Sequence, residues 1–256
     1  MVLIRFLLAL PRAAWRLLRV LLHVLWGLLI LAFLFDRLDT AGRHARIGAW
    51  SAGLLRALGL RLQVHGQARA GAGLLVANHV SWLDIAALHS ACPRARFVSK
   101  ADVLQWPLLG WMIRQGGTLF IQRERKRDAM RVVHEMAAAI GQGDLVAVFP
   151  EGTTGPGHPV LPFHGNLLQA AIAVAAPIQP VALRYHQPGQ AFAEAARYIG
   201  DTTLLGSLAC ILMASGLTVE VDFLSPQASA HADRRSLAEA LRGQLEAALE
   251  TRAQAG

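Results

Sequence analysis

The sequence is organised around nine residues, Val76-Ala77-Asn78-His79-Val80-Ser81-Trp82-Leu83-Asp84. An apolar run at residues 73–77 is typical of a buried strand, and the apolar segment 85–88 favours a helix. His79 and Asp84 therefore lie where a strand gives way to a helix, and a turn there can bring their side chains together. A carboxylate that holds one imidazole nitrogen makes a histidine a better base near pH 7. The same spacing also fits a loop histidine followed by an acidic residue in the first turn of a helix.

Three further segments follow in order, and each places polar residues within or after an apolar run. They are Gly116-Gly117-Thr118-Leu119-Phe120-Ile121-Gln122-Arg123, Phe149-Pro150-Glu151-Gly152-Thr153 and Ile178-Gln179-Pro180-Val181-Ala182-Leu183. In the middle segment a strand ends in a glycine-rich loop, and glycine lets backbone N–H groups approach an anion closely. Each segment alone is an ordinary strand end or turn, so their common order carries the signal.

Together the four segments, which span residues 78–183, resemble the four ordered motifs of the glycerolipid acyltransferase family. This family comprises the bacterial lysophosphatidate acyltransferases and their relatives, and its first motif is Asn-His-x4-Asp. The resemblance implies that an acyl group moves from a thioester, acyl-CoA or acyl carrier protein, to the free hydroxyl of a lysolipid. His79 would act as the general base and Asp84 would orient it. The thioester is a cosubstrate, and the resemblance implies no resident cofactor and no metal.

The resemblance also implies a set of substrate-binding residues. They are Asn78, Ser81, Lys100, Gly117, Phe120, Arg123, Glu151, Gly152, Thr153 and Pro180. Arg123 is the first candidate for an anionic head group, and Lys100 is the second. Glu151 and Thr153 can either hydrogen-bond a glycerol hydroxyl or order the loop that carries them.

The third motif departs from the family pattern at one position. The family usually carries Glu-Gly-Thr-Arg, and this chain has Thr154 where the arginine stands. The change removes a candidate cation for a phosphate group. The default acceptor is 1-acylglycerol 3-phosphate, which gives phosphatidate in phospholipid biosynthesis. The Thr154 variant, with Val160-Leu161-Pro162-Phe163 after it, also resembles the branch that acylates lyso-ornithine lipid, which has no phosphate, and this acceptor ranks second.

A membrane lipid-binding protein without turnover is the alternative of another class. The His79 and Asp84 pair argues against it, because binding alone needs no base. The composition fits both a membrane-associated enzyme and a membrane lipid-binding protein, because hydrophobic residues make up 54% of the chain and charged residues only 16%. The net charge of +8 predicts an anionic partner. An anionic bilayer is favoured over nucleic acid, because the sequence has neither zinc-ligand spacing nor the basic recognition helix of a DNA-binding protein.

Residues 1–50 are predicted to form a membrane-anchoring helical segment, and residues 51–256 the catalytic domain. Residues 20–35 are nearly all apolar, and arginines flank them on both sides, so the positive-inside rule selects no orientation. A retained anchor is favoured over a cleaved signal peptide, and both a spanning and a monotopic helix stay open. The expected location is the inner (cytoplasmic) membrane, with the catalytic domain at its cytoplasmic face.

The catalytic region alternates between strand and helix patterns, which predicts an α/β fold with a mixed central sheet flanked by helices. Strands are predicted at residues 60–65, 74–77, 96–99, 118–121, 145–149, 178–183 and 218–223, and a helix at 128–140. Residues 204–217 favour a buried or interfacial helix. Ser236 and Glu239 form a capping-box pattern before the C-terminal helix. Cys92 and Cys210 are too few for a disulfide framework and are expected to be small buried residues in a reducing compartment.

Overall fold

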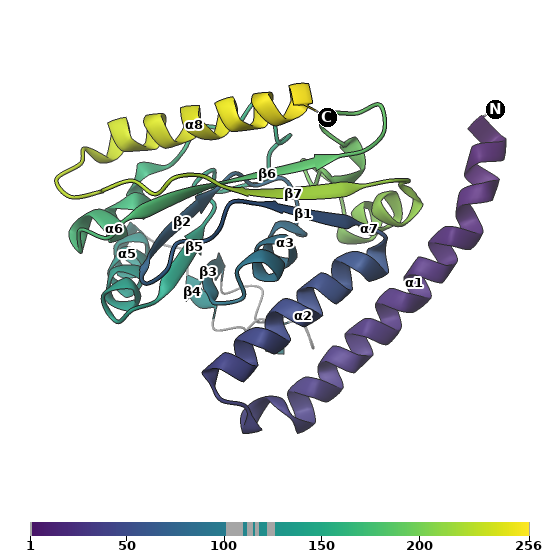
Figure 1. Ribbon diagram of the computed structural model, residues 1–256, viewed down its shortest axis with the longest axis horizontal. Coiled ribbons are helices and arrows are strands. Elements are labelled where there is room, and N and C mark those ends of the chain that lie inside the picture. Colours follow the sequence, from purple (N-terminus) through teal and green to yellow (C-terminus); the bar gives the residue numbers. More distant parts are fainter. Residues whose placement is uncertain (1, 101–109, 112–114, 116–117, 122–125, 256) are drawn as a thin grey trace.

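The computed structural model describes residues 2–100, 110, 111, 115, 118–121 and 126–255. Within them a seven-stranded sheet forms the centre of the molecule, in the order β1-β7-β6-β2-β5-β3-β4 (Figure 1). The strands are β1 (Arg61–His65), β2 (Gly73–Ala77), β3 (Ala95–Lys100), β4 (Leu119–Ile121), β5 (Leu145–Val148), β6 (Ile178–His186) and β7 (Thr218–Phe223). The sheet is mixed, because β7 runs antiparallel to β6 and the other neighbouring pairs are parallel.

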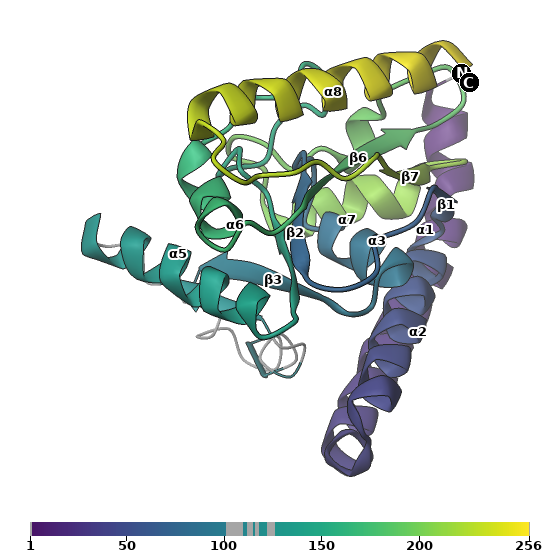
Figure 2. The ribbon, with the colours of Figure 1, turned by 60° about the vertical axis from the view of Figure 1, so that its left-hand side comes forward.

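Helices cover both faces of this sheet. They are α1 (Val2–Phe33), α2 (Thr40–Leu58), α3 (Asp84–Ala91), α5 (Lys126–Gly141), α6 (Gln169–Ala173), α7 (Leu204–Met213) and α8 (Arg234–Ala255). One core joins the sheet to α2, α3 and α7, and a second core joins its other face to α5, α6 and α8 (Figures 1 and 2). Strands covered on both faces need apolar side chains at successive positions, and β2 and β5 are buried along their whole length. The predicted α/β fold is therefore confirmed.

The sheet topology places two of the motifs side by side. Strand β2 lies between β5 and β6 and runs parallel to both, with Val76 paired to Val148 on one side and to Pro180 on the other. Segments that follow the carboxyl ends of parallel neighbours meet at one edge of the sheet. The segment with His79 follows β2 and the segment with Glu151 follows β5. The first and third motifs therefore share that edge.

The N-terminal helices α1 and α2 run antiparallel to each other as a hairpin (Figure 1). Residues Ala9–Phe33 are long and apolar enough to cross a membrane, with a mean hydropathy of 1.9 and only 11% of the window buried in the protein. Helix α2 continues into the catalytic region, where Leu54, Leu55 and Leu58 are buried in the core. The predicted domain boundary between residues 50 and 51 falls inside this helix.

Two local predictions were wrong. Cys92 is buried as expected, but Cys210 is exposed, because it lies on the outer side of α7. Helix α8 begins at Arg234 and is capped by Asp233, whose Oδ1 accepts the N–H groups of Arg235 and Ser236 and the hydroxyl of Ser236. Ser236 therefore lies inside the helix, and an aspartate three residues upstream takes the capping role.

Candidate active site

His79 and Asp84 meet in the turn between β2 and α3. The Nδ1 atom of His79 lies 2.7 Å from Oδ2 of Asp84. The His79 side chain is 21% exposed, whereas that of Asp84 is fully buried. Because an ionised carboxylate only accepts hydrogen bonds, Nδ1 carries the proton in this pair and Nε2 keeps its lone pair. The predicted contact between His79 and Asp84 is therefore present, and it fixes the tautomer of the imidazole.

The position of Asp84 is fixed by several donors. Its Oδ2 accepts the backbone N–H groups of Val80 at 2.7 Å and Ser81 at 3.0 Å, and its Oδ1 accepts the hydroxyl of Tyr185 at 2.7 Å. Asp84 is also the first residue of α3, where the positive end of the helix dipole favours a carboxylate. Burial and the charge of Asp84 raise the pKa of Tyr185 well above its ordinary value, so the phenol stays protonated and donates.

The third motif holds the backbone of His79 on both sides. Oε1 of Glu151 accepts the N–H of His79 at 2.6 Å, and the N–H of Gly155 donates to the carbonyl of His79 at 2.7 Å. The other oxygen of Glu151 accepts the N–H of Leu161 at 3.2 Å. Of the two roles that the sequence left open for Glu151, this geometry fits the ordering of the loop. Burial raises the pKa of Glu151 to about 7, and the N–H groups of His79 and Leu161 act against that rise.

An aromatic stack supports the imidazole from one side. The ring of Phe149 lies parallel to that of His79, with ring centres 4.1 Å apart and planes inclined by 13°. Phe97 of β3 stacks in turn on Phe149 at 5.9 Å. The base is therefore packed against the core on one ring face, and its Asp84 bond fixes the rotation of the ring.

Three other predicted substrate-binding residues are buried at this edge of the sheet. Asn78 is buried, and its side-chain amide donates to the carbonyl of Leu183 at 2.9 Å and accepts the N–H of Leu183 at 2.8 Å. It joins the end of β2 to β6. Ser81 is buried too, and its Oγ has no hydrogen-bond partner among the described residues. Pro180 is buried inside β6 opposite Val76. A substrate-binding role of these three residues stays a prediction.

In the glycine-rich loop after Glu151, some residues are exposed and others contact neighbouring segments. Gly152 has φ +71°, a left-handed conformation that favours glycine, and an added Cβ would lie 3.2 Å from the ring of His164. Thr153 is exposed at the surface. The hydroxyl of Thr154 donates to the carbonyl of Tyr198, so this position serves as a link to the segment before α7.

Four predicted residues have no described side chain. Lys100 ends β3 and Phe120 lies in β4, where the structure describes the backbone of both. Gly117 and Arg123 lie outside the described residues. Their predicted contacts with the acceptor stay predictions.

Tyr185 is the site residue that the sequence analysis missed. It follows the fourth motif by two positions along β6, and it is 2% exposed. Residues that alternate along a strand share a face, so Leu183 and Tyr185 both point toward the first motif. That alternation was visible in the sequence, but the register between β6 and β2 was not.

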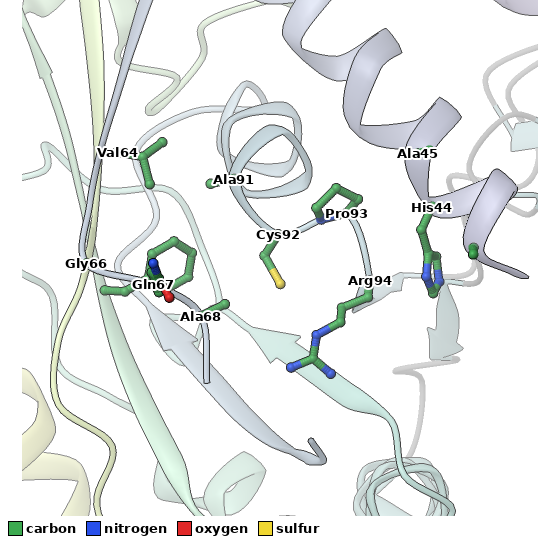
Figure 3. Close-up of a pocket in the computed structure, with 12 residues that line it drawn as sticks. His44, Ala45, Val64, Gly66, Gln67, Ala68, Ala91, Cys92, Pro93 and Arg94 are labelled. Carbon is green, nitrogen blue, oxygen red and sulfur yellow. The ribbon is translucent and has the colours of Figure 1, made fainter. Parts of the chain in front are cut away.

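A separate cavity of about 580 Å³ opens elsewhere on the molecule (Figure 3). Its lining comes from the start of α2, the segment after β1 and the segment after α3, and includes Cys92 and Arg94. Helix α3 separates it from His79, because the cavity lies at the carboxyl end of that helix and the catalytic pair at its amino end. The guanidinium of Arg94 donates to the carbonyls of Arg69 and Gly71.

A histidine held by a buried carboxylate, at the carboxyl ends of parallel strands, is an arrangement typical of group-transfer and hydrolytic enzymes that remove a proton from a hydroxyl. Comparisons with known proteins narrow this class. The family model described as Acyltransferase matches residues 61–184. The lyso-ornithine lipid O-acyltransferase of Pseudomonas aeruginosa is 39% identical over 189 residues, 74% of this chain and 72% of that protein.

A second relative is the 1-acyl-sn-glycerol-3-phosphate acyltransferase of Neisseria gonorrhoeae, 35% identical over 75% of this chain and 76% of that protein. The crystal structure of the acyltransferase PlsC from Thermotoga maritima has a TM-score of 0.64, with coverage of 92% of this chain and 97% of that one. At 18% identity this likeness shows the fold. The chain belongs to the acyltransferase family, and it is a lipid-biosynthetic acyltransferase.

Proposed function

We propose that the chain transfers a fatty acyl group from acyl-CoA or acyl carrier protein to the free hydroxyl of a lysolipid. The observation that carries this proposal is the 2.7 Å contact between His79 Nδ1 and Asp84 Oδ2, which leaves Nε2 to accept a proton. Nε2 takes the hydroxyl proton while the oxygen attacks the thioester carbonyl. The carbon–sulfur bond then breaks, and the proton passes from His79 to the departing thiolate. The products are an ester and a free thiol, and no acyl-enzyme is needed.

Thr154 bears on the choice of acceptor. A phosphate head group is best met by arginine or lysine, and this position instead holds a neutral hydroxyl that donates to Tyr198. We therefore place lyso-ornithine lipid first and 1-acylglycerol 3-phosphate second, which reverses the order expected from the motifs. The name of the Pseudomonas aeruginosa relative supports the first acceptor, and that of the Neisseria gonorrhoeae relative supports the second.

The apolar helix α1 would hold the enzyme at the bilayer that contains its acceptor and its product. Large apolar side chains of α1, among them Trp15, Leu21 and Trp26, are more than half exposed. Such a surface is suited to lipid. Because CoA and acyl carrier protein are soluble donors of the cytoplasm, we place the catalytic domain at the cytoplasmic face of the inner membrane.

The test is a thioester-consumption assay with the full-length protein in detergent, offered lyso-ornithine lipid and lysophosphatidate in parallel reactions. The wild type should form the acylated lipid and one thiol per ester. His79→Ala should lower kcat by about a thousandfold or more, since the general base is removed. His134→Ala is the matched control, because His134 is exposed on α5 and should leave kcat unchanged.

The alternatives give different results. Thiol release with free fatty acid and no acylated lipid would indicate a hydrolase. No turnover of either acceptor, together with retained lipid binding, would support a non-catalytic lipid-binding protein. Faster turnover of lysophosphatidate would return that lipid to first place, and would mean that cations other than an arginine at position 154 meet the phosphate.

A further inference from the structure

We infer that the outer face of α7 is a second lipid-contacting surface, beside α1. This surface would bring the bilayer close to the catalytic turn, the turn between β2 and α3 that carries His79. This inference rests on the proposed function, which places α1 at the bilayer. Helix α7 reads Leu-Leu-Gly-Ser-Leu-Ala-Cys-Ile-Leu-Met and has no charged side chain. A ten-residue helix without charge is normally covered by other parts of a soluble protein.

One face of α7 is covered and the other is not. Ser207, Ile211 and Leu212 are buried against the core. On the outer face Cys210 is exposed, and Leu205 is 77% exposed, the largest fraction among the exposed large hydrophobic side chains that the structure describes. Such an uncovered apolar face marks a surface that binds a partner or a membrane.

The neighbouring helix identifies the occupant. Helix α7 packs beside α1, and two α1 arginines bind its carboxyl end: Arg12 donates to the carbonyl of Met213 at 2.8 Å, and Arg16 to those of Leu212 and Ala214 at 2.8 and 2.7 Å. These hydrogen bonds hold the two helices together at this end of α7. The outward apolar face of α1 comprises Leu10, Trp15, Leu17, Leu18, Leu21, Leu22, Leu25, Trp26, Leu29 and Phe33. A bilayer that covers the exposed side chains of α1 would therefore lie next to α7.

Net charge favours the same occupant. The chain carries +8, which attracts it to the anionic lipids of a cytoplasmic leaflet. A helix that lies on such a surface with its apolar face inserted needs no spanning length, and α7 has only ten residues.

One contact connects α7 to the catalytic turn, and two more connect the segment before α7 to the first and third motifs. The indole N–H of Trp82 donates to Oγ of Ser207 at 3.1 Å. In the segment before α7, Tyr198 donates its N–H to the carbonyl of Val80 at 3.0 Å and accepts the hydroxyl of Thr154. Val80 and Trp82 flank Ser81 in the first motif. We therefore place the acyl chain of the lysolipid beside α7 and its hydroxyl toward His79.

The native thiol on α7 provides the deciding measurement. A bimane probe is attached to Cys210 in a full-length Cys92→Ala variant. The labelled protein is bound to vesicles of phosphatidylethanolamine and phosphatidylglycerol whose acyl chains are brominated, and the quenching of the bimane fluorescence is measured. The control carries the probe at position 130, in a Cys92→Ala, Cys210→Ala, Met130→Cys variant. Met130 is 60% exposed and belongs to α5. Helix α5 lies on the opposite side of the molecule from α1 (Figures 1 and 2). Both positions are exposed, so neither label disturbs the core.

The expected result is strong quenching at position 210 and little at position 130. Equal quenching at the two positions would overturn the inference, because bromine quenches only probes that reach the acyl chains. A supporting arm uses Leu205→Asp, which should lower turnover of vesicle-embedded lysolipid by about tenfold, because a charge is costly among apolar chains. Met130→Asp should not change that turnover.

The two proposals fail separately. Quenching needs no turnover, so an inactive wild type would refute the proposed acyl transfer and leave the α7 result to stand on its own. An active wild type whose Cys210 probe is not quenched would refute the α7 surface and leave the acyl transfer intact.

Discussion

Asp84 accepts four described hydrogen bonds, and one of them comes from the phenol of Tyr185. Tyr185→Phe removes this donor and little volume. We expect kcat to fall by about tenfold, the range for one hydrogen bond to a charged group. A carboxylate that loses a donor also holds an imidazolium more tightly, so the acidic limb of the kcat/KM profile should move to higher pH. Steady-state kinetics between pH 5 and pH 9 measure both effects.

Tyr198→Phe is the matched control, because the chain has two tyrosines and the described contacts of Tyr198 come from its backbone. It should leave the pH profile in place. An unchanged profile in Tyr185→Phe, with only a lower kcat, would mean that the phenol fills space and does not act on Asp84.

Glu151 predicts a pH-dependent stability. Its pKa rises from 4.5 to about 7 in the folded protein, chiefly through burial. The unfolded chain therefore loses this proton first, and stability falls as the pH rises from 4.5 through about 7. The full effect is about 3 kcal/mol. Urea unfolding of the wild type and of Glu151→Gln, at pH 4.5 and pH 8, measures it.

The glutamine stays neutral, so the wild type should lose about 3 kcal/mol more of its free energy of unfolding than the variant over this interval. Parallel pH dependence in the two proteins would show that folding does not raise the pKa of Glu151.

Single residues also show how far the sequence could predict the site. The spacing of His79 and Asp84 allowed their contact, because both lie in one turn. Asn78 and Tyr185 bond across more than 100 positions, to Leu183 and Asp84. Such contacts depend on the register between two strands, and alternation within one strand does not reveal it.

At the scale of elements, the junction of α1 and α7 supports a prediction. Arg16 donates to two carbonyls at the end of α7, where backbone acceptors lack partners within the helix. Arg16→Gln should cost about 1–3 kcal/mol and lower Tm by several degrees, as thermal unfolding in detergent would measure. Arg19→Gln is the control, since Arg19 is exposed on the same helix. Equal Tm values for the two variants would contradict a role of Arg16 at this junction.

Elements with a strong period were predicted well, and their ends were predicted less well. Helix α2 begins at Thr40 because Asp39 caps it by accepting the N–H of Gly42. This cap lies close to the apolar run of α1, so the sequence analysis included it in the predicted anchor segment. Similarly, Asp233 and Ser236 both favour the first turn of α8, and only the folded backbone selects between them.

For the whole molecule, local patterns predicted the fold class but not the strand order. Burial on both faces explains the apolar runs of β2 and β5, so those runs indicate an α/β sandwich. The placement of β1 beside β7, more than 150 residues later in the chain, depends on how the last strand returns across the sheet. No periodicity within either strand encodes that return.

The hydrogen bonds that Asn78 and Tyr185 make at the catalytic turn have a consequence for redesign. Asn78 and Tyr185 tie the catalytic turn to the centre of the sheet, whereas Thr153 and Thr154 lie in a surface loop. The same loop also holds the backbone of His79 through Glu151 and Gly155, so a change of head-group selection has to leave these two residues in place. Biocatalysts that acylate chosen membrane lipids are therefore better sought by exchanging Thr153 and Thr154 alone than by grafting the whole loop.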